Sequence, residues 1–164
     1  MGRTHQKRLL HDLDEIRKEL STEVGKLKPE EFDWSPKPEL EMKTCKALLQ
    51  EIGTMEKICM NWVVNRQMLD WNTAVPWSGD TAASTMKDLE AVRNDTLAYL
   101  RDATEEQLQT PQAVPDEWRQ YFPEDAIEPE EMIRWVSKHE YYHLGQLITY
   151  RWILGDNPYK TTPA

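Results

Sequence analysis

The sequence has few cysteines and no long apolar run, and each absence excludes a class of protein. Its only two cysteines, Cys45 and Cys59, are 14 positions apart. On one helix they would be separated by about 21 Å, far beyond disulfide reach, so we expect two reduced thiols. No apolar stretch approaches the roughly 20 residues that span a bilayer, and Met1–Lys7 runs into charged residues without the apolar segment of a signal peptide. We therefore expect a cytoplasmic protein with no membrane partner.

Positive charge is also scarce. The chain has 20 Lys and Arg against 29 Asp and Glu, for a net charge of -9 and a pI near 5.0. A protein that binds the phosphate backbone of nucleic acids needs a basic cluster or arm, and none stands out here. We therefore expect no nucleic-acid partner.

Apolar residues recur at helical spacing in the first half of the chain. Steps of three and four residues predict two amphipathic helices, the second over about residues 42 to 67. The first stripe is Leu9, Leu13, Ile16, Leu20, Val24 and Leu27; the second is Cys45, Leu48, Ile52, Met55, Cys59 and Trp62.

Two more helices are predicted in the second half. Thr85 is placed to cap the third, whose inward residues would be Met86, Leu89, Leu97 and Leu100. A proline and early carboxylates in 128–131 open the fourth, and Gly155 is placed to end it. The fourth stripe is Met132, Val136, His139, His143, Leu147, Tyr150 and Leu154.

These four segments predict an all-α protein, a single four-helix-bundle domain over residues 1–164. No segment alternates with period two for long enough to suggest a sheet. The connections over about residues 68–84 and 104–128 are long for simple antiparallel hairpins, so one or both are expected to cross the bundle or cover it as a lid.

His139 and His143 are the main chemical signal. Their i, i+4 spacing in the inward row of the fourth helix brings two imidazoles within reach of one metal ion. The alternative is a pair of buried neutral histidines satisfied by hydrogen bonds. His5 and His11 are weaker ligand candidates, since His11 falls off the apolar row and His5 lies near a terminus.

The pair also fits the H-E-x-x-H pattern of zinc proteases, with Glu140 as general base. This motif is weakly specific, because it has only five positions and any residue is allowed at two of them. Such enzymes need a third ligand, commonly from downstream, and after His143 the chain offers only Asp156. A metalloprotease is therefore a remote alternative.

The helix from His139 to Trp152 closely resembles the H-x-x-x-H-x-G-Q-L helix of the DinB-like, YfiT-type family. The turn Asp33-Trp34-Ser35-Pro36 is similar to the family's Trp-Ser turn before its second helix. The resemblance implies a four-helix bundle, often dimeric, that holds a divalent ion with one histidine from the second helix and two from the fourth.

The second helix departs from the family. Where a Leu-Leu-x-His pattern is usual, this chain reads Leu48-Leu49-Gln50-Glu51. Glu51, or else Gln50, would then take the place of the first histidine. The implied ligand set is Glu51, His139 and His143, which suits zinc and also nickel, manganese or ferrous iron. The alternative is a lost site, with Glu51 salt-bridged or solvated.

The resemblance implies a metal-dependent enzyme acting on a small molecule, of the thiol-dependent transferase or isomerase type with a low-molecular-weight thiol as cosubstrate. Glu140 and Glu56 are candidates for acid/base or supporting roles, although ordinary solvated carboxylates are the alternative. Aromatic residues Tyr141, Tyr142, Trp71 and Trp77 are candidates to line a pocket. The rival hypothesis is a non-catalytic dimeric protein with a degenerate metal site. We expect a homodimer in either case.

Overall fold

The computed structural model describes residues 4–160, and its main elements are four long α-helices. The fold is mostly helical, as the apolar stripes predicted. The long helices are α1 (Thr4–Val24), α2 (Cys45–Asn65), α3 (Ala82–Asp102) and α5 (Pro129–Ile153). The short elements are the 3-10 turns η1 (Pro29–Glu31), η2 (Pro38–Leu40) and η3 (Asp116–Trp118), the helix α4 (Glu105–Gln109) and the strands β1 (Gln112–Ala113) and β2 (Ala126–Ile127).

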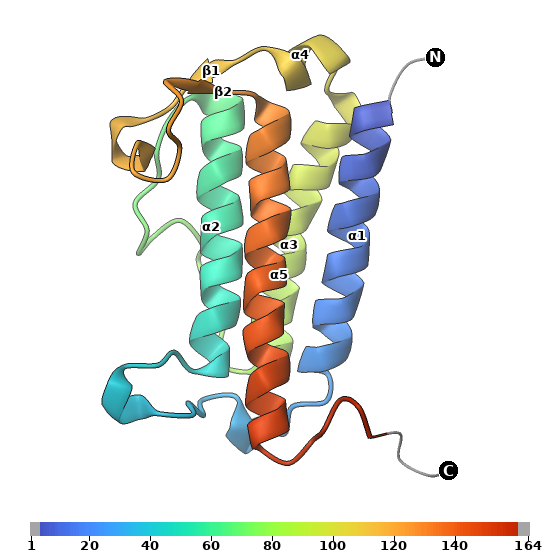
Figure 1. Ribbon diagram of the computed structural model, residues 1–164, viewed down its shortest axis with the longest axis vertical. Helices are drawn as coiled ribbons and strands as arrows, with labels where there is room; N and C mark the ends of the chain where they lie inside the picture. The colour runs from blue at the N-terminus through green and yellow to red at the C-terminus, as the bar shows by residue number, and fades with distance from the viewer. Residues whose placement is uncertain (1–3, 161–164) are drawn as a thin grey trace.

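The four long helices pack side by side in a bundle (Figure 1). Helices α1 and α5 start at the end that carries α4, whereas α2 and α3 run in the opposite direction. Each of α1 and α2 packs against both α3 and α5. Because α2 ends at the α4 end and α3 starts at the opposite end, the connection 66–81 runs back along the bundle, as expected for one or both of the long connections. The connection 103–128 stays at the α4 end.

Polar caps set the start of the long helices. The hydroxyl of Thr44 accepts a hydrogen bond from the Ala47 N–H at 3.1 Å, and the hydroxyl of Thr81 accepts one from the Ser84 N–H at 3.1 Å. Thr81, not Thr85, therefore caps α3. Thr85 lies inside the helix and is fully buried, so the prediction placed the start four residues late. Gly155 follows α5 with φ +104°, as its predicted capping role requires.

The connection between α3 and α5 contains structure that the sequence did not predict. Strands β1 and β2 form a two-residue antiparallel ladder, with Gln112 opposite Ile127. This ladder and η3 hold residues 112–127 against the α4 end of the bundle (Figure 1). Two residues per strand are too few to produce the alternation by which strands are recognised.

The apolar core is divided into two halves. One half, toward the α4 end, includes Leu9, Leu13, Ile58, Leu100 and Met132. The other includes Ile16, Leu20, Ile52, Leu89 and Leu147. Both cysteines are free and buried, one in each half, as expected. Between the halves the inward positions of all four long helices carry charged side chains, described below.

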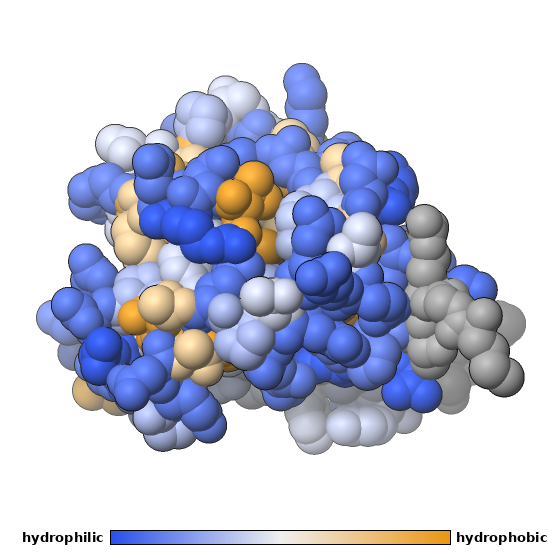
Figure 2. All heavy atoms as spheres, turned by 90° about the horizontal axis from the view of Figure 1, so that it is seen from above, coloured by the Kyte–Doolittle hydropathy of each residue, from blue (hydrophilic) through white to orange (hydrophobic). Residues whose placement is uncertain are grey.

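The surface at the α4 end of the bundle is largely hydrophilic (Figure 2). Seen from the α4 end, it is mostly covered by hydrophilic residues with small apolar areas among them (Figure 2). Among residues 4–160, no helix is both long enough and apolar enough to cross a bilayer.

Candidate metal centre

His139 and His143 lie on the side of α5 that faces α2. Their Nε2 atoms are 3.1 Å apart and their ring centroids 4.5 Å apart. The side chain of His143 is only 4% exposed. The i, i+4 spacing therefore does bring two imidazole nitrogens to one point.

Glu51 of α2 completes a group of three donors. Its Oε2 atom lies 3.7 Å from Nε2 of His143, and one donor atom from each of the three residues lies within 4.8 Å of the other two. The Glu51 side chain is 18% exposed, so the group lies just below the surface between α2 and α5. The predicted ligand set is thus brought together by two helices.

The donor spacing fits a divalent ion. Around a tetrahedral ion with bonds of about 2.0–2.1 Å, neighbouring donor atoms are roughly 3.3 Å apart. The His139–His143 and His143–Glu51 separations, 3.1 and 3.7 Å, bracket that value. Two imidazoles and one carboxylate also form an accepted set for catalytic zinc, which leaves a position for water or substrate. The group could therefore bind a metal ion after small side-chain adjustments.

Neighbouring side chains orient the two imidazoles. Nδ1 of His143 lies 2.7 Å from Oε1 of Gln146, so an Nδ1–H donating to this oxygen would leave Nε2 free as the ligand atom. Trp135 stacks on the ring of His139, with a centroid distance of 5.3 Å and an interplanar angle of 20°. Burial lowers the pKa of His139 to about 4 and also lowers the pKa of His143. Both rings are therefore neutral at pH 7, as metal ligation requires.

Lys43 is the charged neighbour of this group. Its ammonium forms an ion pair with Oε2 of Glu51, the same oxygen that faces His143. The Lys43 side chain is 51% exposed, so this pair lies at the surface edge of the site. Without an ion, Lys43 balances the Glu51 carboxylate.

Glu140 does not join the three donors, although it stands between the histidines in sequence. Its side chain is fully buried and paired with arginines of α1 and α3 rather than with the three donors. Arg17 of α1 donates to it through Nε at 2.8 Å, and Arg93 of α3 also donates to it. A carboxylate whose oxygens are held by two arginines is not available as a general base. The structure gives no support to an acid/base role for Glu140, and with it the H-E-x-x-H protease alternative loses its base.

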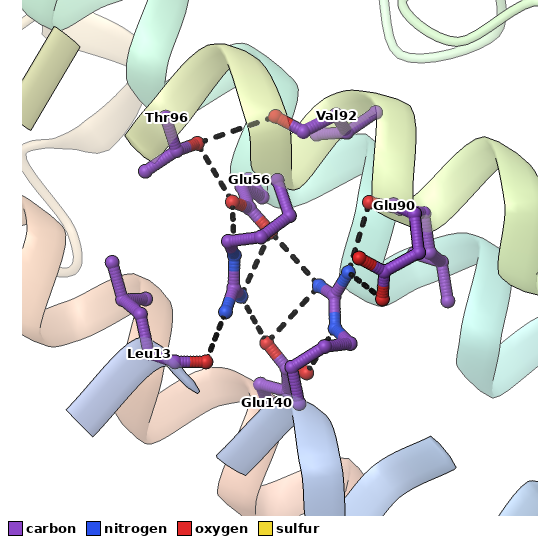
Figure 3. Close-up of polar contacts among 9 residues, drawn as sticks. Leu13, Glu56, Glu90, Val92, Thr96 and Glu140 are labelled. Carbon is purple, nitrogen blue, oxygen red and sulfur yellow. Dashed lines mark hydrogen bonds and ion pairs between the residues drawn. The ribbon is translucent and has the colours of Figure 1, made fainter. Parts of the chain in front are cut away.

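The same arginines also bind Glu56 of α2, so all four long helices meet in one charge cluster (Figure 3). Arg93 Nε lies 2.7 Å from Glu56 Oε1, and Arg17 NH2 lies 3.2 Å from Glu56 Oε2. The Thr96 hydroxyl donates to Glu56 at 2.7 Å, and Arg17 donates to the carbonyl of Leu89 at 2.9 Å. We call Arg17, Glu56, Arg93 and Glu140 the charge quartet. Its formal charges cancel, and each of its side chains is at most 6% exposed.

The quartet corrects the expectation that Glu56 and Glu140 are either supporting groups for the metal or ordinary solvated carboxylates. Burial alone would raise the pKa of Glu56, but the guanidinium groups of Arg93 and Arg17 and the hydroxyl of Thr96 outweigh it and lower the pKa. The same carboxylates raise the pKa of Arg93 despite its burial. Glu56 and Arg93 therefore stay charged in the core.

Of the other sequence candidates, Tyr142 touches a donor residue, since its ring lies 5.1 Å from the ring of His143. His5 bonds to Glu130 at 2.8 Å, and His11 is exposed on α1. Tyr141 and Tyr142 are about half exposed or more, and Trp71 is 45% exposed. Trp77 packs against Gly53. None of these four aromatic residues lines the cavity beside the donors, which is formed by other aromatic side chains.

The fold and the three donors define a helical-bundle protein with a candidate metal site between two helices. Comparisons with known proteins agree with this class. The family model described as "DinB superfamily" matches residues 12–147. The chain therefore belongs to the DinB superfamily. Among solved structures, it is similar to a DinB-like protein, YjoA, from Bacillus subtilis, with 16% identity, 96% of each chain covered and a TM-score of 0.66. That likeness shows the shared fold. No curated protein matches the chain.

Proposed function

We propose that this protein holds a divalent metal ion with Glu51, His139 and His143 and is a metal-dependent enzyme acting on a small molecule. The reaction type proposed is transfer or isomerisation that depends on a low-molecular-weight thiol. The observation that carries the proposal is the convergence of three donor atoms within 4.8 Å of one another. Membership of the DinB superfamily supports it.

The surroundings of the donors suit such chemistry. An ion held by three protein ligands lowers the pKa of a bound water or thiol and acts as a Lewis acid. The chain's own residues supply the setting: Gln146 fixes the tautomer of His143, and Trp135 shields one face of His139. Lys43 places a positive charge at the exposed edge, where an anionic thiol or its acceptor would approach.

The donor set leaves a choice among metals. Imidazole suits zinc, nickel and iron, whereas a carboxylate also suits manganese. We propose zinc, nickel, manganese or ferrous iron as the candidates, since a mixed set of two nitrogens and one oxygen accepts each of them.

Elemental analysis of the purified, untagged protein tests the proposal. We expect one equivalent of a divalent metal per chain, lost in His143→Ala and retained in His11→Ala, which removes an exposed histidine on α1. Far-ultraviolet circular dichroism should be the same in all three proteins, because the apolar stripes supply most of the stability. A wild-type protein without metal after incubation with each candidate ion would overturn the proposal.

Catalysis is tested on the metal-loaded protein with a thiol and an electrophile. With L-cysteine and monochlorobimane, the thiolate sulfur forms a bond to carbon, the carbon–chlorine bond breaks and chloride leaves. We expect the loaded wild type to accelerate this reaction and His143→Ala not to do so. Metal bound without any acceleration would favour the non-catalytic alternative below over the enzyme.

One observation favours the rival function, a non-catalytic protein whose metal site is degenerate. The Lys43 ammonium already satisfies Glu51, as expected of a site that has lost its ion. However, an exposed ion pair contributes only about 0–1 kcal/mol, which is too little to exclude a divalent ion. Lys43→Met separates the two cases. If only this variant binds metal, the rival is correct; if the wild type binds it as well, the site is functional.

We further propose that the protein is a homodimer. The outer side of α5 exposes Tyr141, Tyr142, Trp152 and Ile153, each between 48% and 63% accessible, and such apolar surface is unusual for a monomer. Light scattering at micromolar concentration should give twice the 19.3 kDa chain mass. A monomer mass over a wide concentration range would contradict this.

A further inference from the structure

A cavity of about 210 Å³ lies between α2 and α5, beside two of the three proposed ligands. Glu51 and His139 form part of its wall, so the cavity borders the proposed metal site. The remaining wall comes from three segments. It consists of Met55 and Cys59 of α2, Met132 and Trp135 of α5, and the aromatic side chains of 118–122.

Successive turns of the two helices build this wall. Glu51, Met55 and Cys59 are spaced by four residues and therefore share one face of α2. Met132, Trp135 and His139 are spaced by three and four and share one face of α5. The two faces oppose each other because α2 packs directly against α5.

The segment 118–122 closes the cavity over the helices. Phe122 packs between Trp118 and Trp135, with ring centroids 6.4 and 6.1 Å apart, and Trp118 packs in turn on Trp62 at 5.8 Å. The inner wall at Cys59 and Met132 is buried, while Tyr121 is 63% exposed at the outside. The cavity therefore has an aromatic roof, and Tyr121 lies on its solvent-exposed side.

The size of the cavity limits what it can hold. An apolar protein cavity of about 150 Å³ binds benzene, whereas pockets for drug-sized ligands measure roughly 300–1,000 Å³. A volume of about 210 Å³ therefore matches one six-membered ring with a few further atoms.

The chemistry of the wall limits it further. Aromatic rings, thioether groups and a buried thiol make up the part away from Glu51 and His139. Burial raises the pKa of the Cys59 thiol far above its usual range, so this part of the wall is uncharged at pH 7. An apolar group gains free energy by leaving water for such a wall, while a charged group would be left without partners.

From this arrangement we propose that the cavity is the substrate-specificity pocket of the metal centre and binds an aromatic or similarly sized apolar group. A donor atom one or two bonds away on the same molecule would occupy an open position of the ion. The inference rests on the proposed metal site and adds the class of substrate: small molecules with a ring-sized apolar end and a metal-binding polar end.

Two matched probes test the pocket on the metal-loaded protein. Benzohydroxamate and acetohydroxamate carry the same metal-binding group and differ in a phenyl against a methyl group. Titration calorimetry should show benzohydroxamate binding more tightly by roughly tenfold or more, the gain for even one extra apolar carbon in a fitted pocket.

Filling the cavity should remove that preference. In Met55→Trp the indole would occupy the space for the phenyl group, so benzohydroxamate should bind no better than acetohydroxamate. Val64→Trp is the matched control: it adds the same side chain to an exposed position of α2 away from the cavity, and should keep the preference. Met55→Phe is a milder filling variant if Met55→Trp does not retain its metal.

Metal content, measured on the same samples, separates the two ways of failing. If the protein holds metal but the two probes bind equally, or if filling leaves the preference intact, the pocket inference is overturned and the metal site stands. If the wild type holds no metal, the proposed function fails and the pocket inference fails with it. A preference that is lost on filling and retained in Val64→Trp supports both.

Discussion

Arg17 of α1 donates a hydrogen bond of 2.8 Å to Glu140 of α5, the residue that stands between the two proposed ligands His139 and His143. Each residue turns a helix by about 100°, so a fixed direction for Glu140 fixes the directions of both histidines. Arg17 and Arg93 hold Glu140 toward α1 and α3. The histidines are thereby left on the side of α5 that faces Glu51 of α2. The charge quartet thus sets the rotation of the helix that carries the candidate metal centre.

The quartet should be essential to the stability of the bundle. Arg93→Met leaves two buried carboxylates with one arginine, which should lower the free energy of unfolding by about 3–5 kcal/mol. Urea denaturation followed by circular dichroism measures this change. Arg101→Met, on the exposed part of the same helix, should change it by no more than about 0.5 kcal/mol.

A double variant distinguishes lost charge balance from lost packing. Arg93→Met combined with Glu56→Met removes one charge of each sign and leaves Arg17 paired with Glu140. Its loss of stability should be smaller than that of Arg93→Met alone, because no uncompensated charge remains. A double variant at least as unstable as the sum of the single variants would show that packing, not charge balance, dominates.

The stability should also depend on acidity through Glu56. Its pKa is lowered in the folded protein from the ordinary 4.5, so the unfolded chain takes up the proton first on acidification. The contribution of Glu56 is fully present above pH 4.5 and is lost as the pH falls below 4.5 and through the folded pKa. Urea midpoints measured between about pH 6 and 3 should fall more steeply in the wild type than in Glu56→Gln. Equal slopes would mean that Glu56 does not titrate with folding.

The sequence predicts the bundle well because most inward positions of each long helix are apolar and recur at helical spacing. Leu9, Leu13, Ile16 and Leu20 are all at most 1% exposed, as the spacing indicated. The start of α3 was placed wrongly because Thr81 and Thr85 both precede apolar residues, and only the structure shows that Thr81 exchanges hydrogen bonds with Ser84. Which threonine caps the helix depends on the path of the connection 66–81, which the sequence pattern does not predict.

The charge quartet was missed because single charged residues on a helix are usually solvated. A signal was present nonetheless. Glu56 lies four residues after Ile52, Arg93 four after Leu89 and Glu140 four after Val136, so each charge occupies an apolar row. To predict that these residues pair, one must know their positions along the bundle axis, and these positions depend on the order and direction of the helices. The ligand set could be predicted from the sequence because two of the ligands share one helix and the family resemblance indicated the third position.

Gln146 should govern metal affinity without touching the ion. Gln146→Leu removes the acceptor that lies 2.7 Å from Nδ1 of His143, which should weaken metal binding about 10- to 100-fold. Gln146→Glu keeps an acceptor and should restore most of the affinity. Gln109→Leu, on the exposed face of α4, is the control for loss of an amide. Competition with a chelating dye measures all three, and unaltered affinity in Gln146→Leu would exclude a positioning role.

Glu51→His tests the departure from the family pattern. A third imidazole in place of the carboxylate should raise the affinity for zinc or nickel relative to manganese, because imidazole favours the former ions. Competition titrations of the metal-free protein at one fixed pH give the ratio, since ligation requires deprotonated imidazole. A metal gained only in the variant would support the degenerate-site rival. An unchanged ratio would remove Glu51 from the ligand set.

The location of bound metal tests the central claim most directly. Crystals of the protein loaded with zinc, with data collected above and below the zinc absorption edge, give an anomalous difference map that shows the ion alone. We predict one peak per chain between α2 and α5, within about 2.0–2.2 Å of the Glu51 carboxylate and of Nε2 of His139 and His143. A peak coordinated by other residues, or none near these three side chains, would contradict the account.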